Sequence, residues 1–152
     1  MFGGIGKFLK NAIGSAMKIE NRDQFQATVG GCILVIYADG DCELSELDSL
    51  KKLLRANETL ENFADEVNTE IDRFVKVMEA GVTTGKVKIM KEIRDCIGDE
   101  AAAIEVFAAI CDIAKLERGD KPQGVILPPE LDVVKYIGNE LNINLKDFDI
   151  EC

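Results

Sequence analysis

The sequence predicts an all-α protein, a compact bundle of about seven helices, from two observations. Apolar residues recur at three- and four-residue spacing along most of the chain, and nowhere do they alternate as they do in strands. Two long apolar stretches, residues 27–38 and 101–116, carry little charge and fall short of the ~20 residues that cross a bilayer. We therefore expect both stretches to form adjacent helices at the centre of one domain, for which 152 residues are sufficient.

The segment from residue 26 to residue 54 contains the first of these helices and the most acidic part of the chain. Gly30 and Gly31 lie in the middle of the apolar stretch, where each costs roughly 1 kcal/mol relative to Ala. The backbone of another helix is therefore expected to pack closely against this face. Gly40 is expected to end this helix in the left-handed conformation, with Asp39 in its last turn. Ser45 is the expected N-cap of the following amphipathic helix, which runs to residue 56.

The other elements are predicted from the same helical spacing. Residues 1–22 form a basic amphipathic segment, which we expect to dock on its own domain; contact of residues 1–17 with an anionic membrane surface is the alternative. A short helical turn is expected at residues 60–63. Further helices are expected over residues 64–80, with a solvated outer face, 83–98, with Val87 on the apolar face, and 101–116. After a loop at 118–127, two prolines open a last helix that reaches residue 141.

Charge and composition restrict the function. The net charge is −10, and because residues 1–22 carry +3, the remainder carries −13. Such an acidic body disfavours nucleic acid and favours cations or basic protein surfaces. The chain has no His, which removes Ser-His and Cys-His nucleophilic machinery. Its five cysteines form no C-x-x-C pair and no signal peptide is evident, so a reduced, cytoplasmic protein is expected.

The acidic turn, residues 39–48, is the candidate functional site, because it holds five carboxylates and no basic residue. Asp39, Asp41, Glu43 and Glu46 are the predicted metal ligands. Asp39, Asp41 and Glu43 fall at positions 1, 3 and 5 of an EF-hand loop, but Leu44 and Leu50 occupy positions 6 and 12, so the site is not an EF-hand. Carboxylate oxygens suit hard cations, with Ca²⁺ expected and Mg²⁺ or Mn²⁺ as alternatives.

The chain repeats this plan once. An apolar helix, an acidic Gly-containing loop and an amphipathic helix occur at 27–54 and again at 101–141, which divides the domain into halves at 23–98 and 99–152. The second copy offers a weaker candidate metal site, formed by Asp120, Glu130 and Asp132. It is weaker because Arg118 stands at the place of Asp39 in this alignment.

The run Thr28-Val29…Ile36-Tyr37-Ala38-Asp39-Gly40…Glu46 resembles the signature of the tellurite-resistance TerB family, and the similarity extends over nearly the whole chain, including the closing Leu145-Lys146-Asp147-Phe148. The resemblance implies an all-helical domain with two pseudo-equivalent halves and an acidic face that binds divalent cations. It also implies a role in a bacterial stress-response system that works with membrane proteins of the same operons, without enzymatic activity. Asp39, Gly40 and Glu46 match the motif directly; Asp41 and Glu43 join the candidate set by proximity.

Three functions remain in view. The leading hypothesis is a non-enzymatic module that binds a divalent cation at the acidic turn and a partner protein through its acidic face. The second is a metal-independent acidic adaptor for a basic protein partner. The third, a metal-dependent phosphohydrolase, is disfavoured because the chain has no His, no second clear carboxylate cluster and no phosphate-binding glycine loop.

Overall fold

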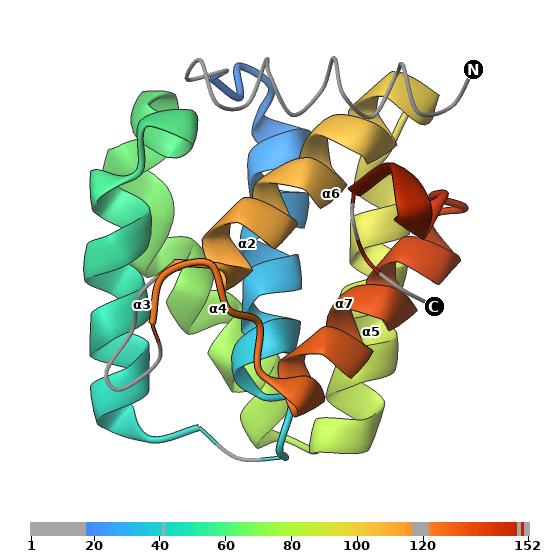
Figure 1. Cartoon of the computed structure of the whole chain (residues 1–152). Helices are drawn as coiled ribbons and strands as arrows, with labels where there is room; N and C mark the ends of the chain where they lie inside the picture. Colours follow the sequence, from blue (N-terminus) through green and yellow to red (C-terminus); the bar gives the residue numbers. More distant parts are fainter. Residues whose placement is uncertain (1–17, 41, 117–121, 149, 151–152) are drawn as a thin grey trace.

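The computed structural model describes residues 18–40, 42–116, 122–148 and 150, and these residues fold into helices without a strand. They form six α-helices and two 3₁₀ helices, arranged as a compact bundle (Figure 1). In chain order these are α2 (Arg22–Ile36), α3 (Leu44–Ala56), η1 (Glu58–Glu66), α4 (Val67–Glu79), α5 (Val82–Cys96), α6 (Glu100–Ala114), α7 (Pro128–Glu140) and η2 (Leu145–Phe148). The all-α prediction is confirmed.

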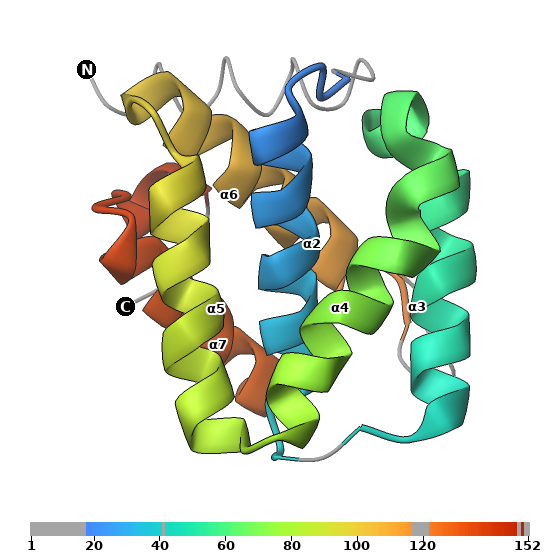
Figure 2. The same cartoon turned by 180° about the vertical axis from the view of Figure 1, so that it is seen from behind.

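Helix α2 is the centre of the bundle. It begins at Arg22, where the side chain of Asn21 accepts hydrogen bonds from the backbone N–H groups of Asp23 and Gln24 and so caps the helix. From Ala27 onward every residue of α2 is buried. The helix packs against α4 and α5 on one side and against α6 and α7 on the other, as Figures 1 and 2 show from opposite directions. The predicted adjacency of the two apolar helices, α2 and α6, is confirmed.

The two glycines of α2 face different neighbours. A Cβ at Gly30 would lie 3.2–3.4 Å from Phe74 of α4 and from Ile89 and Ile93 of α5. A Cβ at Gly31 would overlap the Cδ1 atom of Ile110 of α6 and lie 2.8 Å from its Cγ1 atom. Neighbouring helices therefore approach this glycine pair closely, tightest at α6, but with side chains and not with the backbone that was predicted.

Helices α3, η1, α4 and α5 form the first connected series around α2. Phe63 of η1 stacks on Phe25 of α2 with ring centroids 4.8 Å apart. Arg73 of α4 donates hydrogen bonds to Glu70 of its own helix and to Glu92 of α5, and the second contact joins the two helices. The charges of α4 predicted a solvated outer face. This prediction holds only in part, because Glu70 is buried. Val87 of α5, predicted to be on the apolar face, is instead 61% exposed.

Helices α6 and α7 complete the bundle. The carboxylate of Asp99 accepts a hydrogen bond of 2.8 Å from the N–H of Ala102 and caps α6. Pro128 and Pro129 open α7, as predicted. Phe107 of α6 and Phe148 of η2 meet edge to face at 5.0 Å, which closes the far side of the core.

Some sequence predictions fall outside the described residues. These include the basic segment at residues 1–17, Asp41, and Asp120 with the loop around it. The described residues hold six α-helices where about seven were expected for the whole chain. None of the described helices is long and apolar enough to cross a membrane.

Candidate functional site

The acidic turn begins where α2 ends. The last residue of α2 is Ile36, and the N–H of Gly40 donates to the carbonyl oxygen of Tyr37 at 2.8 Å, which closes a tight turn. Gly40 has φ +88°, the left-handed conformation predicted for it. Asp39 is exposed in this turn and is not in the last turn of the helix, so its predicted position was wrong by about one helical turn. The carbonyl end of α2 nevertheless lacks a basic residue in its last turn.

The start of α3 also differs from the prediction. The N-cap is Glu43, not Ser45. The side chains of Glu43 and Glu46 form a reciprocal capping box, in which the N–H of Glu43 donates to Oε1 of Glu46 at 3.2 Å. Ser45 was favoured because Ser is a common N-cap, but a carboxylate two residues earlier performs the same task. Two of the four predicted metal ligands therefore have a structural role at the helix start.

The structure brings together Glu43 and Glu46 directly and places Asp39 on the preceding side of the same turn. Within the described ranges, no three His, Cys, Asp or Glu side chains gather closely enough to hold a metal ion. Asp41 lies outside these ranges, so the predicted set of four is described only in part.

Of the second candidate set, the structure describes two residues, Glu130 and Asp132, which both lie in α7. Asp120 lies outside the described residues, Glu130 is half-buried in the first turn of α7, and Asp132 is exposed. Asp132 lines a surface groove together with Ala38, the residue before Asp39. One residue of the second candidate set therefore lines the same groove as the residue that precedes Asp39.

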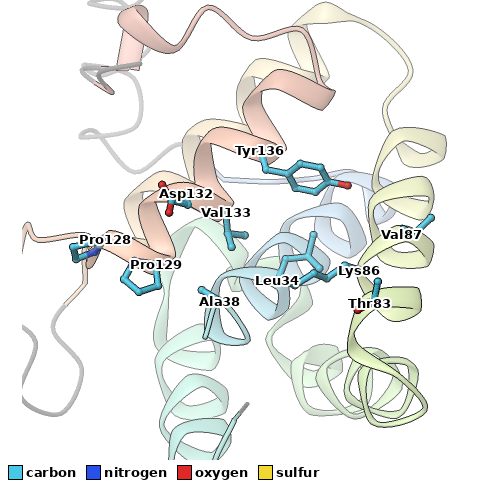
Figure 3. A pocket seen from close by; sticks show the side chains of 10 residues that line it. All are labelled: Leu34, Ala38, Thr83, Lys86, Val87, Pro128, Pro129, Asp132, Val133 and Tyr136. Carbon is cyan, nitrogen blue, oxygen red and sulfur yellow. The ribbon is translucent and has the colours of Figure 1, made fainter. Parts of the chain in front are cut away.

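This groove was not predicted. It has a volume of about 650 Å³ and lies among the end of α2, the start of α5 and the start of α7 (Figure 3). It is lined by Leu34, Ala38, Thr83, Lys86, Val87, Pro128, Pro129, Asp132, Val133 and Tyr136. In the sequence these residues belong to three separate helical segments. The apolar spacing within any one helix cannot show that the three helices leave a groove between them.

The cysteines differ in environment. Cys32 and Cys111 are buried in the core, and burial raises the pKa of the Cys111 thiol to about 12. Cys42, in the acidic turn, is half-buried, and its thiol donates to the carbonyl oxygen of Glu43 at 3.6 Å. Cys96 is half-buried, and burial is the main cause that raises its pKa.

Comparisons with protein-family models, with curated proteins and with solved structures found no match for this chain.

Proposed function

We propose that this chain is a non-enzymatic stress-response module similar to the TerB family, which binds a divalent cation at the acidic turn and a partner protein through its acidic face. The acidic face consists of the exposed carboxylates of the acidic turn and the first turns of α3: Asp39, Glu43, Glu46 and Asp48. The expected ion is Ca²⁺, with Mg²⁺ and Mn²⁺ as alternatives. A membrane protein of the same stress-response system is a candidate partner, on the basis of the resemblance alone.

The observation that carries this proposal is the end of α2. A buried helix ends there without a basic residue, and an exposed carboxylate, Asp39, follows within three residues. The carbonyl end of a helix carries partial negative charge, so an added carboxylate is unfavourable by about 0.3–1 kcal/mol when nothing neutralises it. A bound cation would neutralise both charges at once.

The same turn suggests how the two halves correspond. We infer that α2 with α3 and α6 with α7 are pseudo-equivalent pairs, because each is an apolar central helix followed by an acidic loop and an amphipathic helix. On this view Glu130 and Asp132 are the counterparts of Glu46 and Asp48. Their site is the weaker one because Arg118 replaces the first carboxylate.

The cation site can be tested with Tb³⁺, a hard oxygen-seeking ion that replaces Ca²⁺ and emits when a nearby tyrosine transfers energy to it. Tyr37 lies two residues before Asp39. We expect Tyr-excited Tb³⁺ emission that Ca²⁺ displaces, and a melting temperature that rises with Ca²⁺ because ligand binding stabilises the folded state. Asp39→Asn should weaken both effects. Glu46→Gln should also weaken them while it keeps an oxygen that can accept the capping hydrogen bond.

Two controls locate the signal. Glu100→Gln removes an exposed carboxylate in the first turn of α6 and should leave the emission unchanged. Tyr136→Phe removes the other tyrosine of the chain and should also preserve it. Equal emission and equal melting curves in the wild type and in Asp39→Asn would rule out the cation site.

The capping box favours a second candidate function, the metal-independent acidic adaptor. Since Glu43 and Glu46 already accept backbone hydrogen bonds, their conformation is explained without a cation. This function predicts that a basic partner from a cell extract is retained on the immobilised protein, released by salt and unaffected by chelator. Release of that partner by chelator would favour the cation-dependent module instead.

A further inference from the structure

The groove between α5 and α7 has an apolar floor and polar groups that come from both helices. Leu34 of α2, Ala38 in the turn after α2 and Val133 of α7 are its apolar lining residues (Figure 3). Thr83 and Lys86 come from α5, and Tyr136 extends from α7 with its hydroxyl end toward α5. The volume of about 650 Å³ lies within the range of small-molecule sites. The concavity therefore suits a small ligand with one apolar and one polar end.

Lys86 is the group that defines the polar end. It is half-buried at the groove, and among the described residues it forms neither a hydrogen bond nor an ion pair. Farther along the same helix, Lys91 pairs with Asp95 and Arg94 pairs with Glu140. In a chain of net charge −10, carboxylates are abundant, yet none of those described neutralises this ammonium. The hydroxyl groups of Thr83 and Tyr136 likewise have no hydrogen-bond partner among the described residues.

The apolar wall is exposed to an unusual degree. Val87 is 61% exposed and Tyr136 is 40% exposed, and both line the groove. A ligand that covers them removes apolar surface from water, worth about 25 cal/mol per Å². The same ligand would present an anion to Lys86 and acceptor oxygens to the two hydroxyl groups.

We propose that this groove binds a small amphipathic anion, an unbranched carboxylate whose head lies at Thr83, Lys86 and Tyr136 and whose alkyl chain covers Val87, Val133 and Leu34. The site is distinct from the acidic turn and needs no divalent cation. Among the described residues Asp132 is the one carboxylate that lines the groove, and it comes from the first turns of α7, beside Pro128 and Pro129 (Figure 3). The alkyl end of the ligand, not its carboxylate, would lie nearest to it.

The proposal is tested with sodium decanoate, decanol and decylamine, each below its micelle concentration and in the presence of EGTA. Binding is followed by the fluorescence of Tyr136 in a Tyr37→Phe background, which leaves a single tyrosine, and by NMR shifts of the valine methyl groups. We expect decanoate to bind more tightly than decanol and decylamine, and to shift the methyl resonances of Val87 and Val133. The EGTA makes this result independent of the cation site.

Matched variants separate charge from apolar contact. Lys86→Met keeps the aliphatic stem and should weaken decanoate binding about fivefold, with decanol binding unchanged. Lys88→Met removes an exposed lysine of the same helix that does not line the groove, and should have no effect.

Val87→Asp should abolish binding of decanoate. Because Val87 is largely exposed, the fold should be retained, which circular dichroism verifies. Asp132→Asn should leave decanoate binding the same or tighter.

Several outcomes would overturn the proposal. Equal affinity for decanoate and decanol, with no effect of Lys86→Met, would indicate an apolar groove that suits a partner peptide and not an anion. Tightest binding of decylamine, weakened in Asp132→Asn, would indicate a cation site. No saturable binding of decanoate, or binding that Val87→Asp leaves intact, would show that the groove is not its site.

Discussion

The residue type at Gly31 is restricted by a side chain of the neighbouring helix α6. Replacement of a helical Gly by Ala favours the helix by up to about 1 kcal/mol when space is available. At Gly31 the space is not available, because the new Cβ would overlap Ile110, which is fully buried. Overpacking of this kind typically costs about 1–3 kcal/mol. The expected result for Gly31→Ala is therefore a net loss of stability.

Chemical denaturation measures this effect, and the neighbouring glycine supplies the control. Gly30→Ala, whose Cβ would meet its neighbours at 3.2–3.4 Å, should cost less than Gly31→Ala. Ile110→Val removes the Cδ1 atom that causes the overlap, so the double variant should be more stable than the sum of the two single changes predicts. Strict additivity would show that α6 does not press on α2 at this position.

At the level of elements, Arg73 is the main polar connection between α4 and α5. Its guanidinium group donates to both carboxylate oxygens of Glu70 at 2.9 and 3.2 Å, and to those of Glu92 at 2.7 and 3.1 Å. Hydrogen bonds from these two carboxylates raise the pKa of Arg73 well above its usual range. The group also lies over the ring of Phe74, 4.3 Å from its centroid.

We expect Arg73→Met to destabilise the protein by about 1–3 kcal/mol in urea denaturation, because it leaves the buried carboxylate of Glu70 without its charged donor. Arg73→Lys should recover only part of this loss, since an ammonium group cannot form the planar fork. Lys91→Met, which breaks the exposed pair with Asp95, should cost no more than about 0.5 kcal/mol. If both changes to Met cost the same, the connection at Arg73 is no stronger than a surface pair.

The elements also show what the sequence can and cannot predict. Helical spacing predicted α2 to α7 because apolar positions such as Leu50, Leu54 and Phe74 repeat every three or four residues. The predicted helix ends were less accurate, because a helix end depends on single hydrogen bonds. With Asn21 as its N-cap, α2 begins five residues before its apolar run, and α3 is capped by Glu43 and not by Ser45. The groove was missed because Val87 fits the apolar period of α5 but is 61% exposed, with no helix of the described residues packed over it.

On the scale of the whole molecule, burial of the Cys111 thiol makes the free energy of unfolding depend on pH. Burial raises its pKa from 9.0 to about 12. The unfolded chain therefore loses this proton at lower pH than the folded protein does. The contribution of the buried, protonated thiol to the free energy of unfolding is fully present below pH 9 and is lost as the pH rises toward 12.

We expect the free energy of unfolding to fall more steeply from pH 8 to pH 10.5 in the wild type than in Cys111→Ala, by at most about 1.4 kcal/mol per pH unit. Comparison of the two slopes cancels the titration of lysines and tyrosines that both proteins share. Parallel curves would mean that Cys111 is no better shielded from solvent in the folded protein than in the unfolded chain.

The central position of α2 has a consequence for how the protein is made. Residues 24–36 of α2 carry no charge, and the helices that bury them come later in the chain. Helices α4 and α5 follow first, but α6 is complete only at residue 114, 78 residues after α2 ends. At about 5–20 residues per second, a ribosome needs roughly 4–16 seconds to synthesise that stretch. Throughout this interval the face of the apolar helix α2 that packs against α6 lacks its partner in the nascent chain. Synthesis of this protein should therefore depend on chaperones that bind short apolar segments near the ribosome exit.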